Sequence, residues 1–171
     1  FRSLWGVIHG VYAALPIMRR QGGGHIVNTA SLAGLVPFPY QSLYCTTKYG
    51  VAGMSECLRY ELAADNIRVS VACPGNVVSR IFSTSIMGDA VEGTLPEDAI
   101  PAAEAARIIL AGVAGGAGII AFPDKPRELW RAYATEPEKV EGYLADLAAQ
   151  RRTAFASGDA EALFRPARGR E

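Results

Sequence analysis

The sequence predicts an α/β fold, in which parallel strands form a sheet and helices cross over its faces. The first observation is that three short runs rich in β-branched residues alternate along the chain with longer segments of helical periodicity. This alternation is typical of parallel sheets joined by right-handed crossovers. The second is the composition: half of the 171 residues are hydrophobic, and 17 basic side chains balance 17 acidic ones, as in an ordinary globular domain.

The first element is a helix that is already in progress at residue 1. Apolar residues recur at helical spacing, at Leu4, Val7, Ile8, Val11, Tyr12 and Leu15. No capping residue introduces this pattern, and the chain opens with Phe1 instead of methionine. We therefore expect the sequence to be the C-terminal part of a longer protein. Arg19 and Arg20 suit the last turn of the helix, and glycines 22–24 follow as a turn.

Three strands are predicted, at 25–30, 67–73 and 119–122, with helices at 42–64 and 101–114 between them. The run HIVNTA of the first strand is too apolar to face water on either side, so we expect helices to cover both of its faces. Helix 42–64 is apolar on more than one side, which indicates more than one packing neighbour.

Two helical segments split at Pro137 are predicted beyond the last strand, whereas residues 76–100 carry little periodicity and are expected to form a loop that can include a short helix, with the specificity loop at 78–100. The C-terminal sequence is polar and rich in Ala, Gly and Arg. We assign residues 1–145 to one folded domain and 146–171 to a loose tail.

The candidates for chemistry are a serine, a tyrosine and a lysine. Ser31 falls at the end of the first strand, and Tyr44 and Lys48 are four residues apart in the predicted helix. Residues at i and i+4 share a helix face, with Cβ atoms about 5–6 Å apart. An ammonium about 5 Å from a phenol, at an effective dielectric of about 20, lowers the phenol pKa by about two from its usual value of about 10, while burial opposes this. The pair therefore predicts a tyrosine that can pass a proton near neutral pH.

The surroundings of this motif make it more specific than Tyr-x-x-x-Lys alone. A glycine-led apolar strand precedes Ser31, and after Lys48 the strand in NIRVSVACPGNVVS stops at Pro74-Gly75. In this order the motifs resemble the short-chain dehydrogenase/reductase (SDR) family over residues 1–145. The resemblance implies a Rossmann-like doubly wound parallel sheet, of which only the C-terminal half, about three strands, is present.

The glycine-rich loop that holds the cofactor's pyrophosphate in such folds is not found in this sequence. Glycines 22–24 precede a strand, as do Gly115, Gly116 and Gly118, whereas a phosphate loop follows a strand and opens a helix. We therefore expect the chain by itself to be inactive.

The resemblance implies an NAD(P)-dependent oxidoreductase that interconverts an alcohol and a ketone or aldehyde. Tyr44 would exchange a proton with the substrate oxygen, Lys48 would lower the tyrosine pKa and bind the nicotinamide ribose, and Ser31 would hydrogen-bond the substrate oxygen. The residues implied in binding the nicotinamide end of NAD or NADP are Tyr44, Lys48, Pro74, Gly75, Val77 and Ser79. Val77 would act through its backbone and Ser79 through its hydroxyl.

One position departs from the family pattern. Ser3 stands where the family usually has an asparagine that helps to hold a water-linked proton relay to the lysine, which puts that relay in question. A non-catalytic relative, such as a nucleotide-sensing or scaffold protein, is therefore the alternative. A glycine-rich strand, turn and helix upstream of this sequence would favour the enzyme.

The predicted loop at 78–100 and the two longest helices bear on substrate and partners. Ile81, Phe82, Ile86 and Met87 make an apolar alcohol or carbonyl substrate plausible. NAD and NADP are not distinguished by the residues present. The resemblance implies a homodimer or homotetramer that pairs helices 1–20 and 42–64 with those of a partner subunit.

Several protein classes are disfavoured by composition. Balanced charge without a basic run gives no reason to expect nucleic acid, and no apolar run reaches the roughly 18 residues of a membrane span. Cys45, Cys57 and Cys73 lack metal-ligand spacing, so we expect no metal site and reduced, packing cysteines in the cytoplasm. His9 and His25 have no partner that the sequence identifies, and packing is their expected role.

Overall fold

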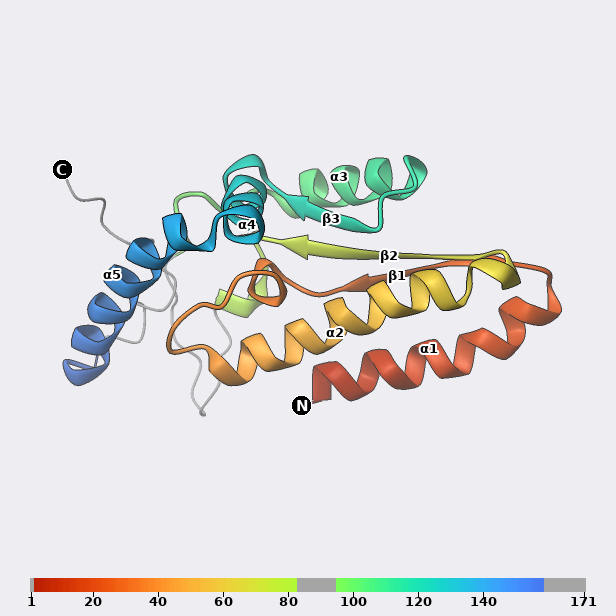
Figure 1. Cartoon of the computed structure of the whole chain (residues 1–171), viewed down its shortest axis with the longest axis horizontal. Helices are drawn as coiled ribbons and strands as arrows, with labels where there is room; N and C mark the ends of the chain where they lie inside the picture. Colours follow the sequence, from red (N-terminus) through yellow and green to blue (C-terminus); the bar gives the residue numbers. More distant parts are fainter. Residues whose placement is uncertain (1, 83–94, 159–171) are drawn as a thin grey trace.

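The structure, a computed structural model, describes residues 2–82 and 95–158 (Figure 1). Its strands, β1 (Gly24–Thr29), β2 (Ile67–Pro74) and β3 (Ile119–Phe122), form one parallel sheet in the order β1-β2-β3. β1 and β2 pair with Ile26 opposite Val69. The predicted α/β fold with three parallel strands is confirmed.

Five α-helices accompany these strands in the described residues: α1 (Arg2–Arg20), α2 (Ser42–Glu61), α3 (Ala102–Ala114), α4 (Asp124–Thr135) and α5 (Pro137–Ala156). α1 and α2 lie on one face of the sheet and α3 on the other (Figure 1). α2 ends earlier than predicted, because the chain continues as a 3-10 turn, Ala63–Asp65, and then reverses at Asn66 in a left-handed conformation.

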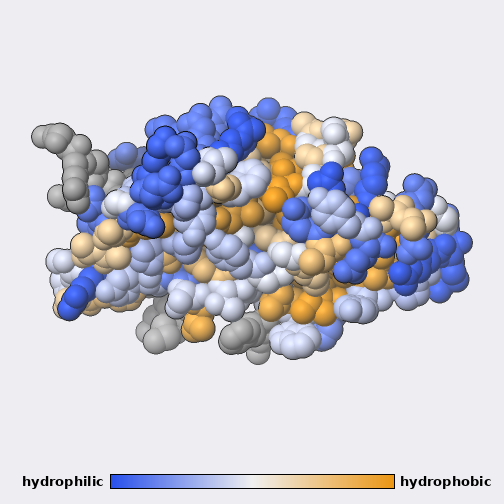
Figure 2. Space-filling view, viewed as in Figure 1, coloured by the Kyte–Doolittle hydropathy of each residue, from blue (hydrophilic) through white to orange (hydrophobic). Residues whose placement is uncertain are grey.

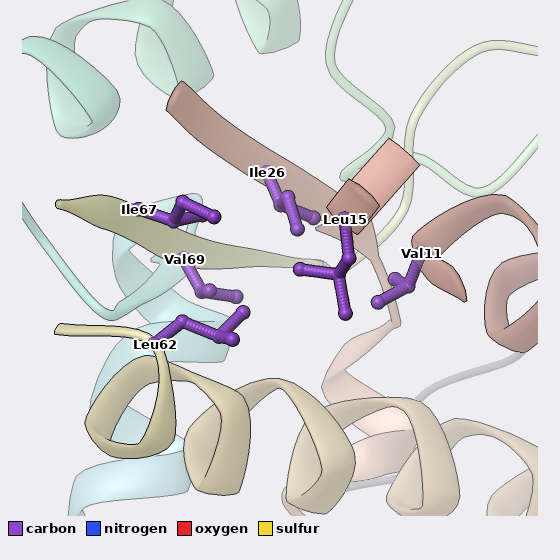
Figure 3. Packing of buried hydrophobic residues seen from close by; sticks show 6 residues of the cluster. All are labelled: Val11, Leu15, Ile26, Leu62, Ile67 and Val69. Atoms are coloured by element: carbon purple, nitrogen blue, oxygen red, sulfur yellow. The ribbon is translucent and has the colours of Figure 1, made fainter. Parts of the chain in front are cut away.

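Apolar clusters on both faces hold the helices to the sheet. One joins α1, both longer strands and the residue after α2 through Val11, Leu15, Ile26, Leu62, Ile67 and Val69 (Figure 3). A second, nearer the carboxyl ends of the strands, contains Ala30, Val51, Ala52, Val71, Cys73 and Ala121. On the opposite face, Ala105 of α3 packs with Ala72, Ile120 and Phe122. Burying one large aliphatic side chain contributes about 1.5–3 kcal/mol, so these clusters fix where α2 lies.

Only one face of β1 is covered in the described residues, which corrects the expectation for strand 25–30. Ile26 and Asn28 are buried against the helices, whereas Val27 is 42% exposed and Thr29 is exposed. The reason is that the α3 cluster includes residues of β2 and β3 but none of β1. β1 is also an edge of the described sheet, a position at which backbone groups remain available for pairing.

A loose tail from residue 146 is wrong for residues 146–156, because α5 continues to Ala156. Leu147 and Arg151 are 1% and 4% exposed, so this part of the helix has tertiary contacts that the polar composition did not predict. Residues 159–171 lie outside the described chain.

The predicted specificity loop is described only in part. Ile81 is exposed and Phe82 is buried in the 3-10 turn Arg80–Phe82, whereas Ile86 and Met87 lie outside the described residues. None of the helices described combines the length and the apolar character needed to cross a bilayer.

Candidate active site

The predicted serine, tyrosine and lysine meet at the carboxyl ends of the strands, the edge at which α/β sheets bind ligands. Ser31 comes directly after β1 and Ala30, while Tyr44 and Lys48 lie in the first two turns of α2. The Ser31 and Tyr44 side chains are hydrogen-bonded, and the Lys48 Nζ lies 5.7 Å from the centre of the Tyr44 ring. The structure therefore brings all three residues together.

The hydroxyl of Ser31 is oriented by the backbone that follows it. Ser31 has an extended conformation and caps the 3-10 turn Leu32–Gly34, where its Oγ accepts a 3.2 Å hydrogen bond from the Ala33 N–H. A serine hydroxyl can accept two hydrogen bonds and donate one. Because Ala33 occupies the oxygen as an acceptor, the hydroxyl hydrogen is available to donate to the Tyr44 oxygen or to a substrate oxygen.

Gly34 is a part of the site that the sequence analysis missed. A β-carbon at this position would lie 2.5 Å from the carbonyl oxygen of Lys48 and 2.8 Å from its carbonyl carbon. Real β-carbons do not approach backbone so closely, so only glycine lets the turn after Ser31 pack against α2. The signal was a glycine three residues after the candidate serine.

Lys48 is held from the strand side. Its Nζ donates a 3.3 Å hydrogen bond to the carbonyl oxygen of Thr29, the last residue of β1. Burial lowers the pKa of Lys48 below its ordinary value, while the nearby Cys73 thiol opposes this. An ammonium has three donors, so two remain beyond the bond to Thr29.

The pKa of Tyr44 corrects the expectation from the helical spacing. Burial raises this pKa above its ordinary value of 10.0, and the hydrogen bond from Ser31 opposes the rise. The ammonium of Lys48 lies 5.7 Å from the ring centre and bonds the Thr29 carbonyl oxygen, and it is not among the causes of the shift in the Tyr44 pKa. Burial therefore favours the protonated form of Tyr44.

Pro74 and Gly75 lie where β2 ends, and Gly75 has a packing role of its own. The Gly75 N–H bonds the Phe122 carbonyl at 2.8 Å, which extends the pairing with β3. A β-carbon at Gly75 would lie 2.6 Å from Cγ of Pro126 in α4. Gly75 therefore allows α4 to approach the end of β2, and this packing role is separate from the cofactor-binding role that the resemblance implies.

The backbone N–H and C=O of Val77 point away from the segment around Ile100, with which Val77 pairs. It forms a parallel bridge with Ile100, in which the Val78 N–H bonds the Ile100 carbonyl at 2.9 Å and the Ile100 N–H bonds the Asn76 carbonyl at 3.1 Å. In a parallel ladder, the N–H and C=O of the bridged residue itself point the other way. Within residues 2–82 and 95–158 these two groups of Val77 have no backbone partner. Ser79, two residues on, is exposed.

Two other residues that the sequence analysis considered are Ser3 and His25. Ser3 is exposed in the first turn of α1. His25 has a partner that the sequence did not identify: its Nε2 lies 2.9 Å from the Ser70 Oγ, which itself donates to the Ala117 carbonyl at 2.6 Å. Because the Ser70 hydrogen is used on Ala117, His25 donates from Nε2. Its Nδ1 is buried without a partner.

Comparison with known proteins identifies the family. Residues 2–87, half of the 171-residue chain, match the family model described as short chain dehydrogenase. The chain belongs to the short chain dehydrogenase family. The match contains Ser31, Tyr44 and Lys48 as well as the segment from Pro74 to Ser79.

Individual relatives match this chain in sequence or in fold. An uncharacterized oxidoreductase of Staphylococcus saprophyticus is 46% identical over 81 residues, which cover 46% of this chain and 33% of that protein. A short chain dehydrogenase of Burkholderia cenocepacia, solved in complex with NADP, matches with a TM-score of 0.71 and 24% identity over 84% of this chain and 56% of that one. A short chain dehydrogenase/reductase of Burkholderia phymatum, in complex with NAD, gives 0.66 and 25% over 80% and 56%.

These matches confirm the predicted Rossmann-like fold. The chain spans about a third of the curated relative and just over half of the solved ones. In the described residues no group of three or more His, Cys, Asp or Glu side chains is placed to hold a metal ion.

Proposed function

We propose that this chain carries the proton-transfer residues of an NAD(P)-dependent oxidoreductase that interconverts an alcohol and a ketone or aldehyde. The observation that supports this most is the hydrogen bonding of Ser31 to Tyr44 beside the Lys48 ammonium, at the carboxyl edge of the sheet. Relatives solved with NADP and with NAD support the cofactor class without deciding between them.

In the reductive direction, Tyr44 acts as the general acid. Because its pKa is raised, the phenol carries its proton at neutral pH and can donate it to a carbonyl oxygen as negative charge develops there. Ser31 donates its hydroxyl hydrogen to the same oxygen, since Ala33 already occupies the hydroxyl as an acceptor. The bound nicotinamide supplies the hydride. For alcohol oxidation the same phenol must first lose its proton.

The residues present fit the nicotinamide end of the cofactor. Lys48 keeps two donors for ribose hydroxyls, and Val77 offers an N–H and a C=O that could pair with the nicotinamide amide. The exposed hydroxyl of Ser79 lies on the same segment. The pyrophosphate loop is not in this sequence, so we propose that residues beyond it supply that loop in the complete enzyme.

The experiment that tests this function compares two tyrosines that are four residues apart, Tyr44 in α2 and Tyr40 in the loop before it. In the full-length protein, Tyr44→Phe is expected to lower kcat by about 10²-fold or more, because the phenyl ring keeps the packing and loses the proton. Tyr40→Phe is the matched control: Tyr40 is 47% exposed and stacks through its ring, so its activity should stay near that of the wild type.

Two results would contradict the proposal. Retention of most activity by Tyr44→Phe would show that another group supplies the proton. Binding of NAD or NADP by the wild type, without turnover on any of a panel of alcohols, ketones and aldehydes, would favour the non-catalytic alternative.

A further inference from the structure

Helix α5 places a buried cation against the loop that leads into α2. Arg151 is 4% exposed, and its Nη1 donates a 2.6 Å hydrogen bond to the carbonyl oxygen of Pro39, 112 residues earlier in the sequence. Burying a guanidinium is unfavourable unless hydrogen bonds replace those to water. Figure 1 shows α5 beside this loop, at the end of the molecule where α2 begins. None of the chemistry proposed above uses Arg151.

The loop that Arg151 contacts has an unusual backbone. Tyr40 has a φ of 61°, in the left-handed region that residues other than glycine adopt rarely and only where their surroundings hold them. The Gln41 N–H bonds the Phe38 carbonyl at 3.2 Å, which closes the turn, and the Cys45 N–H bonds the Gln41 carbonyl at 2.7 Å as α2 begins. Tyr44 lies in this first turn, so its position depends on the loop.

A second contact from α5 lies on Tyr40 itself. The ring of Phe155 stacks on that of Tyr40, with centroids 5.3 Å apart and planes inclined by 21°. Phe155 follows Arg151 by four residues, and so both lie on one face of α5. Leu147, four residues before Arg151, is 1% exposed on the same face and anchors the helix. One stripe of α5 therefore both packs into the molecule and holds the loop.

We propose that Arg151 and Phe155 are positioning residues for Tyr44. They hold the left-handed turn at Tyr40, and through it the first turn of α2, so that the phenol stays within hydrogen-bonding reach of Ser31. This inference rests on the proposed function, because it takes Tyr44 as the proton donor. Arg151 bonds Pro39 and Phe155 stacks on Tyr40, and both residues of the loop precede α2. Arg151 and Phe155 therefore act on Tyr44 through the loop.

The test uses the full-length protein with Arg151→Met, Arg151→Lys and Arg152→Met. Arg152 is the next residue and is exposed, so its replacement removes the same charge without a contact to Pro39. The first measurement is amide hydrogen exchange of residues 45–47, which does not depend on activity. Exchange is expected to be about tenfold faster or more in Arg151→Met, intermediate in Arg151→Lys because lysine keeps a donor, and unchanged in Arg152→Met.

The second measurement is the dependence of kcat and KM on the same variants. Loss of positioning is expected to lower kcat about tenfold or more in Arg151→Met, with a smaller change in KM for the dinucleotide, because Lys48 lies one turn further along α2 than Tyr44. Arg151→Lys should recover part of kcat.

Several results would overturn the inference. They are unchanged exchange of residues 45–47 in Arg151→Met, equal acceleration in Arg152→Met, and a fall in stability with kcat unchanged. If circular dichroism shows that Arg151→Met does not fold, Arg151→Lys and Phe155→Leu carry the test, and unchanged exchange in both refutes the inference. A wild type without oxidoreductase activity would refute the proposed function, while the exchange data would still decide whether α5 holds the start of α2.

Discussion

Gly34 sets how closely the turn after Ser31 approaches the helix that carries Tyr44 and Lys48. Ordinary contacts of a β-carbon begin at 3.4 Å, whereas a β-carbon at Gly34 would lie 2.5 Å from the Lys48 carbonyl oxygen. Gly34→Ala must therefore move the turn and α2 apart by about 0.9 Å, the difference between these two distances. The obstacle is backbone of a packed helix, so no flexible side chain can give way.

The size of the effect follows from this displacement. Overpacking of a well-packed contact costs about 1–3 kcal/mol, so we expect Gly34→Ala to lower the free energy of unfolding by that amount. The glycine has no left-handed φ, so backbone strain adds nothing. Misplacement of catalytic groups by about 1 Å can cost about 10²-fold in rate. We therefore expect kcat to fall by more than the fraction of unfolded protein would explain.

The assay combines urea unfolding, followed by circular dichroism, with steady-state kinetics of the full-length protein. Gly53→Ala is the matched control, because Gly53 lies exposed in the same helix and a β-carbon there would meet nothing within 4 Å. Alanine in an open helical position should raise the free energy of unfolding by about 0.5–1 kcal/mol. A Gly34→Ala protein as stable and as active as the wild type would refute the close-approach argument.

Three further predictions concern pH, assembly and cofactor. Burial and Arg68 lower the pKa of His25 below 6.5, so the stability associated with its neutral form is present above pH 6.5 and lost as pH falls; unfolding curves should show this, and an unchanged loss in His25→Asn would contradict it. Trp5 and Tyr12 on α1 are 54% and 70% exposed, so sedimentation of the full-length protein should show a dimer or tetramer, and a monomer at micromolar concentration would contradict this. Calorimetric titration of this chain alone with NAD or NADP should show no micromolar binding, since the phosphate loop is not in its sequence; such binding would reveal a phosphate site elsewhere.

Apolar surface is consistent with the predicted assembly. Figure 2 shows apolar residues reaching the surface over α1 and again over α3 and β3, whereas α4 is covered by polar residues. Ile17 of α1 and Leu110 of α3 are 55% and 66% exposed. The apolar surface on α1 belongs to one of the two helices of the predicted pairing, which the sedimentation experiment tests.

The elements that the sequence predicted well are those whose signal is local. The strand 119–122 is bounded by glycine and proline, and the structure places β3 at the same residues. The end of α5 was not predictable in this way, because Arg151 and Leu147 are buried by contacts with distant segments. In the described part of the chain one face of β1 has no helix over it, and this was missed for the same reason, since the apolar pattern of HIVNTA cannot show which helices reach it.

In the candidate site, residue types and spacing predicted which side chains meet but not their energetics. Chain order placed Ser31 beside the helix that carries Tyr44 and Lys48, and the structure agrees. The direction of the tyrosine pKa was wrong, because desolvation and the bond from Lys48 to Thr29 depend on tertiary structure. The role of Gly34 was also not predicted, because the only sign of a close contact between two backbone segments in a sequence is the glycine itself.

Titration of Tyr44 tests which force controls the proposed proton donor. Burial raises the pKa of Tyr44 above 10.0 and lowers that of Lys48 below 10.5, since desolvation disfavours whichever form is charged. In the absence of cofactor, the ultraviolet difference titration of wild type against Tyr44→Phe should therefore show a phenol that ionises above pH 10. Because the folded-state pKa is raised, its stabilising contribution is complete below pH 10 and lost as pH rises through that pKa, so Tyr44→Phe should lose less stability than the wild type at alkaline pH. Ionisation well below pH 10 would mean that the Lys48 ammonium, 5.7 Å from the ring centre, outweighs burial, and that the helical spacing alone determines the chemistry.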